Sequence, residues 1–125
     1  MNAARITIVV LGVLLPFLAR LPGGLEWLKQ YTDGGVEGVL FLSAFNAPVW
    51  LGLLALTFVY RRPASLLIPC VLTFGFLAFA HFSMDLASDA QAAVGLVFIP
   101  VLAVPLLVVG GVVGYVVDRI RARQS

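Results

Sequence analysis

The sequence predicts an all-α integral membrane protein: a four-helix bundle that runs antiparallel, up and down, with both termini on the inner side of the membrane. Of the 125 residues, 62% are hydrophobic and 11% are charged, against about 25% charged in an ordinary soluble domain. The apolar residues also gather in four runs, and about 20 such residues make a helix that crosses a bilayer. A soluble chain of this length could not bury so much apolar surface.

The first run, residues 6–19, is framed by Arg5 and Arg20. It is short for a crossing, so we expect Arg20 to extend its guanidinium toward the membrane surface and let the span reach residue 21. A basic start before an apolar run of this length is also typical of a cleaved secretory signal. No Ala-x-Ala cleavage pattern follows the run, which favours an uncleaved first span over residues 6–21.

The first connection, residues 22–38, is the longest one. Its glycine-containing ends, residues 22–24 and 34–35, are typical of breaks in regular structure. Between them, Trp27 and Tyr31 have the i, i+4 spacing of one helix face. The pattern predicts an interfacial loop with one or two helical turns whose aromatic side chains lie at the level of the lipid headgroups.

The other three runs predict spans over residues 39–60, 64–84 and 92–117. Residues 61–63 are too short to let the second and third spans run in the same direction, so we expect a hairpin there. Residues 1–125 then form a single transmembrane domain. The last span is longer than a crossing needs, which favours a tilted helix.

The placement of charge predicts the orientation. With the N-terminus inside, the inner side carries six of the eight basic residues. These are Arg5, Arg61, Arg62, Arg119, Arg121 and Arg123. Lys and Arg in short loops mark the cytoplasmic side. We therefore expect an integral protein of a bacterial inner (cytoplasmic) membrane with both termini in the cytoplasm.

Asn46 and Ser43 are the polar residues that lie deep in the second span. An amide in hydrocarbon needs a hydrogen-bond partner, and interhelical bonds of this kind contribute about 0.6–2 kcal/mol. Two interpretations stay open. One is a contact between helices, which we favour because polar side chains in membrane helices commonly make such bonds. The other is a contact to a transported ion or solute.

His81, Asp85 and Asp89 recur at i, i+4 and i+8, so on a continuing helix they would form one polar stripe at the outer end of the third span. Such a stripe could bind a divalent cation or respond to protons near neutral pH. The alternative, which we favour, is a solvated rim in which Asp89 caps the last helix, because neither carboxylate needs to be buried.

Gly110 and Gly114 form a small-xxx-small pair in the last span. Such a face lets two helices approach closely. The partner helix could belong to the same chain or to a second copy, and the sequence does not distinguish these possibilities.

The sequence contains neither a glycine-rich phosphate loop nor a metal-ligand motif, and the apolar interior of each predicted span holds no acidic residue. We therefore expect no enzyme activity and no cofactor, and neither a catalytic nor a metal site. Nor do we expect binding to nucleic acid. The expected partners are the lipid bilayer, another membrane protein, or a second copy of the chain. The function we favour is a non-enzymatic interaction, accessory or immunity-type protein, and the alternative is a small homo-oligomeric channel or transporter.

Overall fold

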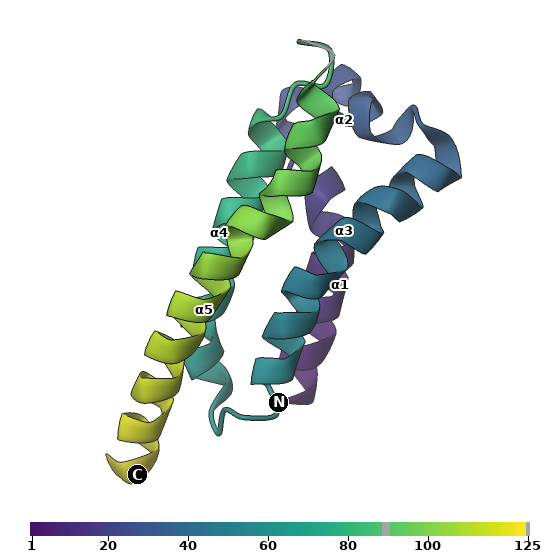
Figure 1. Cartoon of the computed structure of the whole chain (residues 1–125). Helices are drawn as coiled ribbons and strands as arrows, with labels where there is room; N and C mark the ends of the chain where they lie inside the picture. Colours follow the sequence, from purple (N-terminus) through teal and green to yellow (C-terminus); the bar gives the residue numbers. More distant parts are fainter. Residues whose placement is uncertain (89–90, 125) are drawn as a thin grey trace.

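The computed structural model describes residues 1–88 and 91–124, and the elements found there are all helical (Figure 1). In chain order they are α1 (Asn2–Leu18), η1 (Leu21–Gly23), α2 (Leu25–Thr32), α3 (Gly35–Leu56), η2 (Pro63–Leu66), α4 (Leu67–Ser83) and α5 (Ala92–Gln124). Within these residues, four helical segments are long and apolar enough to cross a membrane. They are Asn2–Gly23, Gly35–Leu56, Pro63–Ser83 and Ala92–Gln124.

The four long apolar helices agree with the predicted runs, while their ends differ. α3 begins at Gly35 rather than at residue 39, and Gly35 has a φ of 71°. This left-handed conformation, which favours glycine, turns the chain from α2 into α3. α5 continues past residue 117 to Gln124, because Arg, Ala and Gln are good helix formers whether or not lipid surrounds them.

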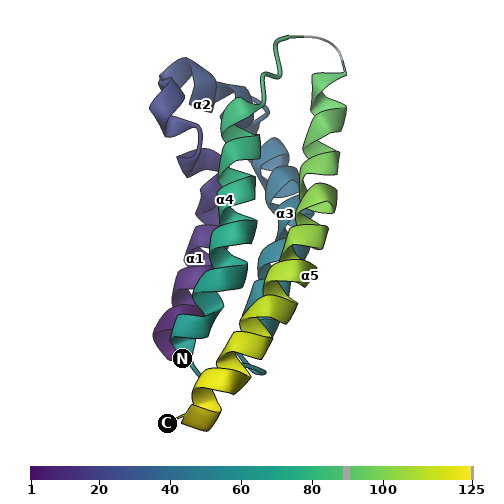
Figure 2. The same cartoon turned by 90° about the vertical axis from the view of Figure 1, so that its left-hand side faces the viewer.

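The long helices pack in a ring in which consecutive helices are not always neighbours. α4 packs most extensively on α5, α3 lies against both α1 and α5, and α1 also contacts α4 (Figure 2). α3 and α4 share few contacts although only residues 57–66 separate them in the sequence. The N-terminus of α1 and the C-terminus of α5 lie at the same end of the structure (Figure 1).

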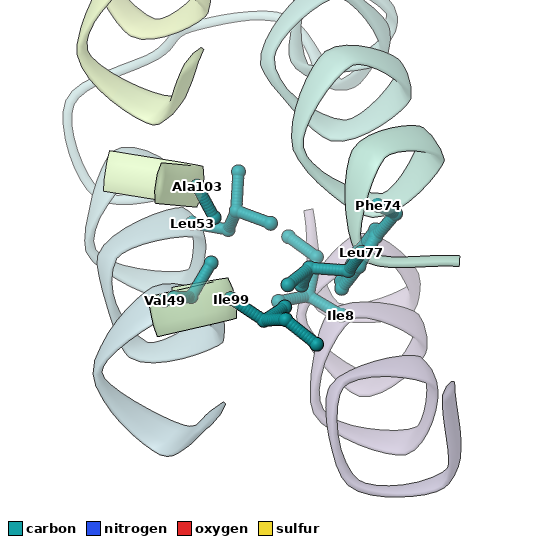
Figure 3. Packing of buried hydrophobic residues seen from close by; sticks show 7 residues of the cluster. All are labelled: Ile8, Val49, Leu53, Phe74, Leu77, Ile99 and Ala103. Carbon is teal, nitrogen blue, oxygen red and sulfur yellow. The ribbon is translucent and has the colours of Figure 1, made fainter. Parts of the chain in front are cut away.

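The core is an apolar cluster to which each of the four long helices contributes (Figure 3). It consists of Ile8, Val49, Leu53, Phe74, Leu77, Ile99 and Ala103. Many large apolar side chains also point outward, among them Leu40 on α3 and Val101, Val108 and Val112 on α5. A structure that is apolar both inside and outside is suited to lipid rather than to water.

The small residues of α5 face the inside of the bundle. Gly110 and Gly114 are buried. A Cβ built on Gly110 would lie 2.9 Å from the Cα of Pro69, and one on Gly114 would lie 2.5 Å from the hydroxyl of Tyr60. The face therefore packs against α4 and the connection that precedes it, within the same chain.

The end of the bundle that holds both termini is called here the basic end, because Arg61, Arg62, Arg119, Arg121 and Arg123 lie in its connection and its final helical turns. Asp118 is fully buried among them. Its two carboxylate oxygens accept hydrogen bonds from the backbone N–H groups of Arg61 and Arg62, each at 2.9 Å. The Tyr60 hydroxyl donates to the carbonyl of Gly111 at 2.5 Å. These bonds fasten the connection between α3 and η2 to α5.

Replacing Asp118 by alanine is expected to lower the free energy of unfolding by about 1–3 kcal/mol, because two backbone N–H groups lose a charged acceptor. Unfolding in detergent with increasing SDS, followed by circular dichroism, measures the change. Asp33→Ala, at an exposed residue, is the control and should leave the transition in place. Equal transitions for the two variants would contradict this role of Asp118.

Candidate functional site

A cluster of polar side chains lies at the end of the bundle opposite the basic end, next to α2, and its members Arg20, Asn46 and His81 are fully buried. Figure 1 shows α2 at this end. We call this cluster the polar cap. It consists of Arg20, Gln30, Tyr31, Asn46, His81 and Asp85. These residues come from the end of the first span, from α2, from α3, from α4 and from the loop after α4.

Arg20 is the centre of the cap and is completely buried. Its Nε donates to the carbonyl of Trp27 at 2.7 Å, and Nη1 donates to the carbonyl of His81 at 2.8 Å and also to that of Met84. Nη2 donates to Oε1 of Gln30 at 2.9 Å. The guanidinium therefore supplies donors to carbonyls at the end of α4, which a helix leaves without partners.

The expectation that Arg20 extends to the membrane surface is thus incorrect in one respect. The side chain does reach the end of the bundle, but protein rather than water encloses it. The guanidinium carbon lies 4.4 Å from the ring centre of Trp27 and 4.1 Å from that of Tyr31. α2 folds over the arginine and replaces its hydration with carbonyls and aromatic faces.

A second set of bonds holds the loop after α4 against α2. Gln30 donates through Nε2 to Oδ1 of Asp85 at 3.0 Å, and its Oε1 accepts from the backbone N–H of Leu86 at 2.8 Å. The indole N–H of Trp27 donates to the carbonyl of Phe82 at 2.5 Å. α2 is therefore fixed to the end of α4 by side chains from two of its turns, Trp27 and Gln30.

His81 links the cap to the interior through a directed chain of hydrogen bonds. The Asn46 amide donates through Nδ2 to the carbonyl of Leu42 at 2.9 Å, so its Oδ1 faces Nε2 of His81 at 3.1 Å. Nε2 must then carry the proton, and Nδ1 accepts from the Tyr31 hydroxyl at 2.8 Å. Burial raises the pKa of Tyr31 to about 12, so the hydroxyl keeps the proton that it donates.

The structure separates the residues of the predicted polar stripe. α4 ends at Ser83, and Met84 is extended with a ψ of 122°, so Asp85 leaves the helix and turns to Gln30. His81 faces inward, fully buried, rather than along a solvated rim. Asp89 lies outside the described residues. Within residues 1–88 and 91–124, no group of three His, Cys, Asp or Glu side chains could hold a metal ion.

Of the two polar residues predicted deep in the second span, the structure brings only one into the cap. Asn46 is buried and contacts His81, whereas Ser43 is half-buried and takes no part in this chain of bonds. Arg20, Gln30 and Tyr31 are the cap residues that sequence reasoning did not identify. The available signal was an arginine directly after an apolar run, with polar and aromatic residues in the following loop, but nothing in that pattern indicates His81 as their partner.

The bond between Asn46 and His81 has a measurable coupling energy. A double-mutant cycle with Asn46→Leu and His81→Leu should give about 0.6–1.7 kcal/mol of coupling, the range for buried polar pairs in membranes. A second cycle with Ser43→Ala and His81→Leu is the control and should give additive effects, because Ser43 does not contact His81. Additivity in the first cycle would show that the interhelical bond contributes nothing to stability.

We call the cap closed because each of its buried side-chain nitrogen and oxygen atoms has a hydrogen-bond partner. The buried side-chain nitrogen and oxygen atoms that lack a hydrogen-bond partner in the described residues belong to Ser65, Thr73 and Arg119, none of which is in the cap. The histidine hydrogen-bonds a phenol and an amide. The arrangement can orient helices and fix α2. Comparisons of this chain with protein-family models, with curated proteins and with solved structures find no match.

Proposed function

We propose that this chain is a non-enzymatic interaction protein of a bacterial inner membrane, an accessory or immunity-type subunit that acts by binding another membrane protein within the bilayer. The observation that carries the proposal is the closed polar cap. Its polar side chains satisfy one another, and the surface left for recognition along the long helices is mainly apolar.

The topology we infer is an antiparallel up-down bundle with both termini in the cytoplasm. The position of the arginines supports it, because Arg61 and Arg62 lie between α3 and η2, at the same end as Arg119, Arg121 and Arg123. Lysine and arginine near the ends of membrane helices mark the cytoplasmic side. The opposite end holds Arg20, which protein encloses. The cap would then lie at the outer surface of the membrane.

The packing between the two ends favours interaction over transport. A transport pathway usually carries polar or ionisable groups that face a cavity near the membrane midplane. Here the central cluster is made of aliphatic and aromatic side chains (Figure 3). Among the described residues, the buried polar side chains of this region are few: His81 and Asn46, which bond each other, and Thr73. The bond between His81 and Asn46 runs between helices, as expected for groups that set helix contacts.

Affinity purification from the native membrane in a mild detergent tests this proposal. We expect one membrane protein to copurify in a fixed stoichiometry, and proteoliposomes of the pure chain to show no ion or solute flux. Substitutions to tryptophan at exposed apolar residues such as Leu40, Val101 and Val112 should reveal the contact face, because one of them will release the partner. Flux that Asn46→Leu abolishes, together with no copurifying protein, would instead establish the small homo-oligomeric channel or transporter.

A further inference from the structure

A groove lies between α1 and α4, which run side by side (Figure 2). Its volume is about 380 Å³. Ala4 and Pro63 line one end, and Leu11 and Phe74 line the other. At helical rise, the distance along α1 from Ala4 to Leu11 is about 10 Å. The groove therefore runs along the helices, and it begins at the basic end.

The walls of the groove are almost entirely apolar. The polar group of Thr7, which also lines it, already donates to the carbonyl of Ala3 at 2.8 Å. On the outer edge, Leu67 and Val71 are 64% and 66% exposed. The groove thus opens sideways toward the surface that the membrane would cover, and its lining matches a hydrocarbon chain.

Positive charge gathers at the basic end of this groove. Arg62 directly precedes Pro63, and its backbone N–H is held by Asp118 at 2.9 Å. Within the described residues, the ion pair found is the one between Lys29 and Glu26, at the opposite end of the bundle. The guanidinium groups of Arg61 and Arg62 are therefore not neutralised by a carboxylate in an ion pair.

The N-terminus of α1 adds to this positive potential. α1 begins at the basic end and has no acidic residue in its first turn. A helix N-terminus carries a partial positive charge that an acid would otherwise offset. At the start of η2, which leads into α4, Asp118 supplies such an acid by accepting from the backbone N–H of Arg62. The arginines and the N-terminus of α1 thus act together on any group that lies at the mouth of the groove.

We propose that this groove is a binding site for an anionic phospholipid of the inner leaflet. One acyl chain lies along the groove, and the phosphate sits at its mouth beside Arg62 and Arg61. Anionic headgroups are attracted to basic segments at the membrane surface, whereas the ammonium group of a zwitterionic lipid would meet the same positive potential. The inference rests on the proposed membrane insertion and orientation, and it does not depend on which protein the chain binds.

Native mass spectrometry of the whole chain tests the site. The purified protein in detergent is mixed with equal amounts of phosphatidylglycerol and phosphatidylcholine of the same acyl chains. We expect one retained phosphatidylglycerol, at an affinity on the order of tenfold above that of phosphatidylcholine, since each basic residue contributes about fivefold near the surface. Equal retention of the two lipids would overturn the proposal.

Two variants locate the site, each with a matched control. Val71→Trp fills the groove and should abolish retention, while Val101→Trp, at a residue 57% exposed on α5, should retain the lipid. Arg62→Gln should lower the preference about fivefold, while Arg123→Gln, with the same loss of charge at the same end, should leave it within about twofold. If Val71→Trp does not fold, the comparison of Arg62→Gln with Arg123→Gln tests the site on its own. Equal effects of Arg62→Gln and Arg123→Gln would show a diffuse basic surface and no site.

Discussion

Replacing Arg20 by methionine should lower the free energy of unfolding by at least about 3 kcal/mol, one of the two largest effects expected in this chain. The guanidinium donates to the carbonyls of Trp27, His81 and Met84 and to the amide of Gln30. Methionine keeps an unbranched apolar stem and removes every donor. Each buried acceptor left without a partner costs about 1–3 kcal/mol, and the last carbonyls of α4 are among them.

Unfolding of the variant in mixed micelles with increasing SDS measures this effect. Trp27 contacts the guanidinium, so its fluorescence should report loss of the cap at a lower SDS fraction than circular dichroism reports loss of helix. Arg20→Lys should recover only part of the stability, because one ammonium cannot reach acceptors on several sides. Arg121→Met, at an exposed residue, is the control. If Arg20→Met unfolds together with Arg121→Met, the cap does not stabilise the bundle.

Gly110→Leu is expected to have an effect of similar size, about 3 kcal/mol, at the upper end of the range for overpacking. A Cβ at this position would lie 2.9 Å from the Cα of Pro69. Because that atom belongs to the backbone, no side-chain rotation can relieve the clash, and α4 and α5 must move apart. These two helices form the most extensive helix contact in the bundle.

Gly75→Leu is the matched control for this substitution. Gly75 lies on α4, is exposed, and has no atom within 4 Å of a built Cβ. Removing a helical glycine there should leave stability unchanged or raise it by up to about 1 kcal/mol. Sedimentation in detergent adds a second readout. A Gly110→Leu variant that keeps its stability but changes oligomeric state would place this glycine face between two copies of the chain.

The sequence predicts the four long apolar helices well, because an unbroken apolar run of about 20 residues is itself the signal for such a helix. The boundaries are less predictable. Gly35 starts α3 with a positive φ that hydropathy does not reveal, and the arginine-rich tail continues α5 because helix propensity does not depend on polarity.

The arrangement of the polar cap could not be predicted from the sequence. The prediction that His81 and Asp85 form one stripe requires α4 to continue past residue 85, whereas the chain becomes extended at Met84. His81 instead meets Tyr31 and Asn46, which lie 50 and 35 positions away in the sequence. No local periodicity connects residues so far apart. Their contact depends on α2 folding over the bundle, where Arg20, Trp27 and Gln30 hold it.

Cysteine accessibility in intact cells tests the inferred topology most directly. In a Cys70→Ala background, single cysteines are placed at Glu26 on α2 and at Gln124 at the end of α5, and the cells are treated with a membrane-impermeant maleimide. We expect Glu26→Cys to react in intact cells and Gln124→Cys to react only after lysis. Labelling of Gln124→Cys in intact cells, with Glu26→Cys protected, would reverse the orientation and contradict the account.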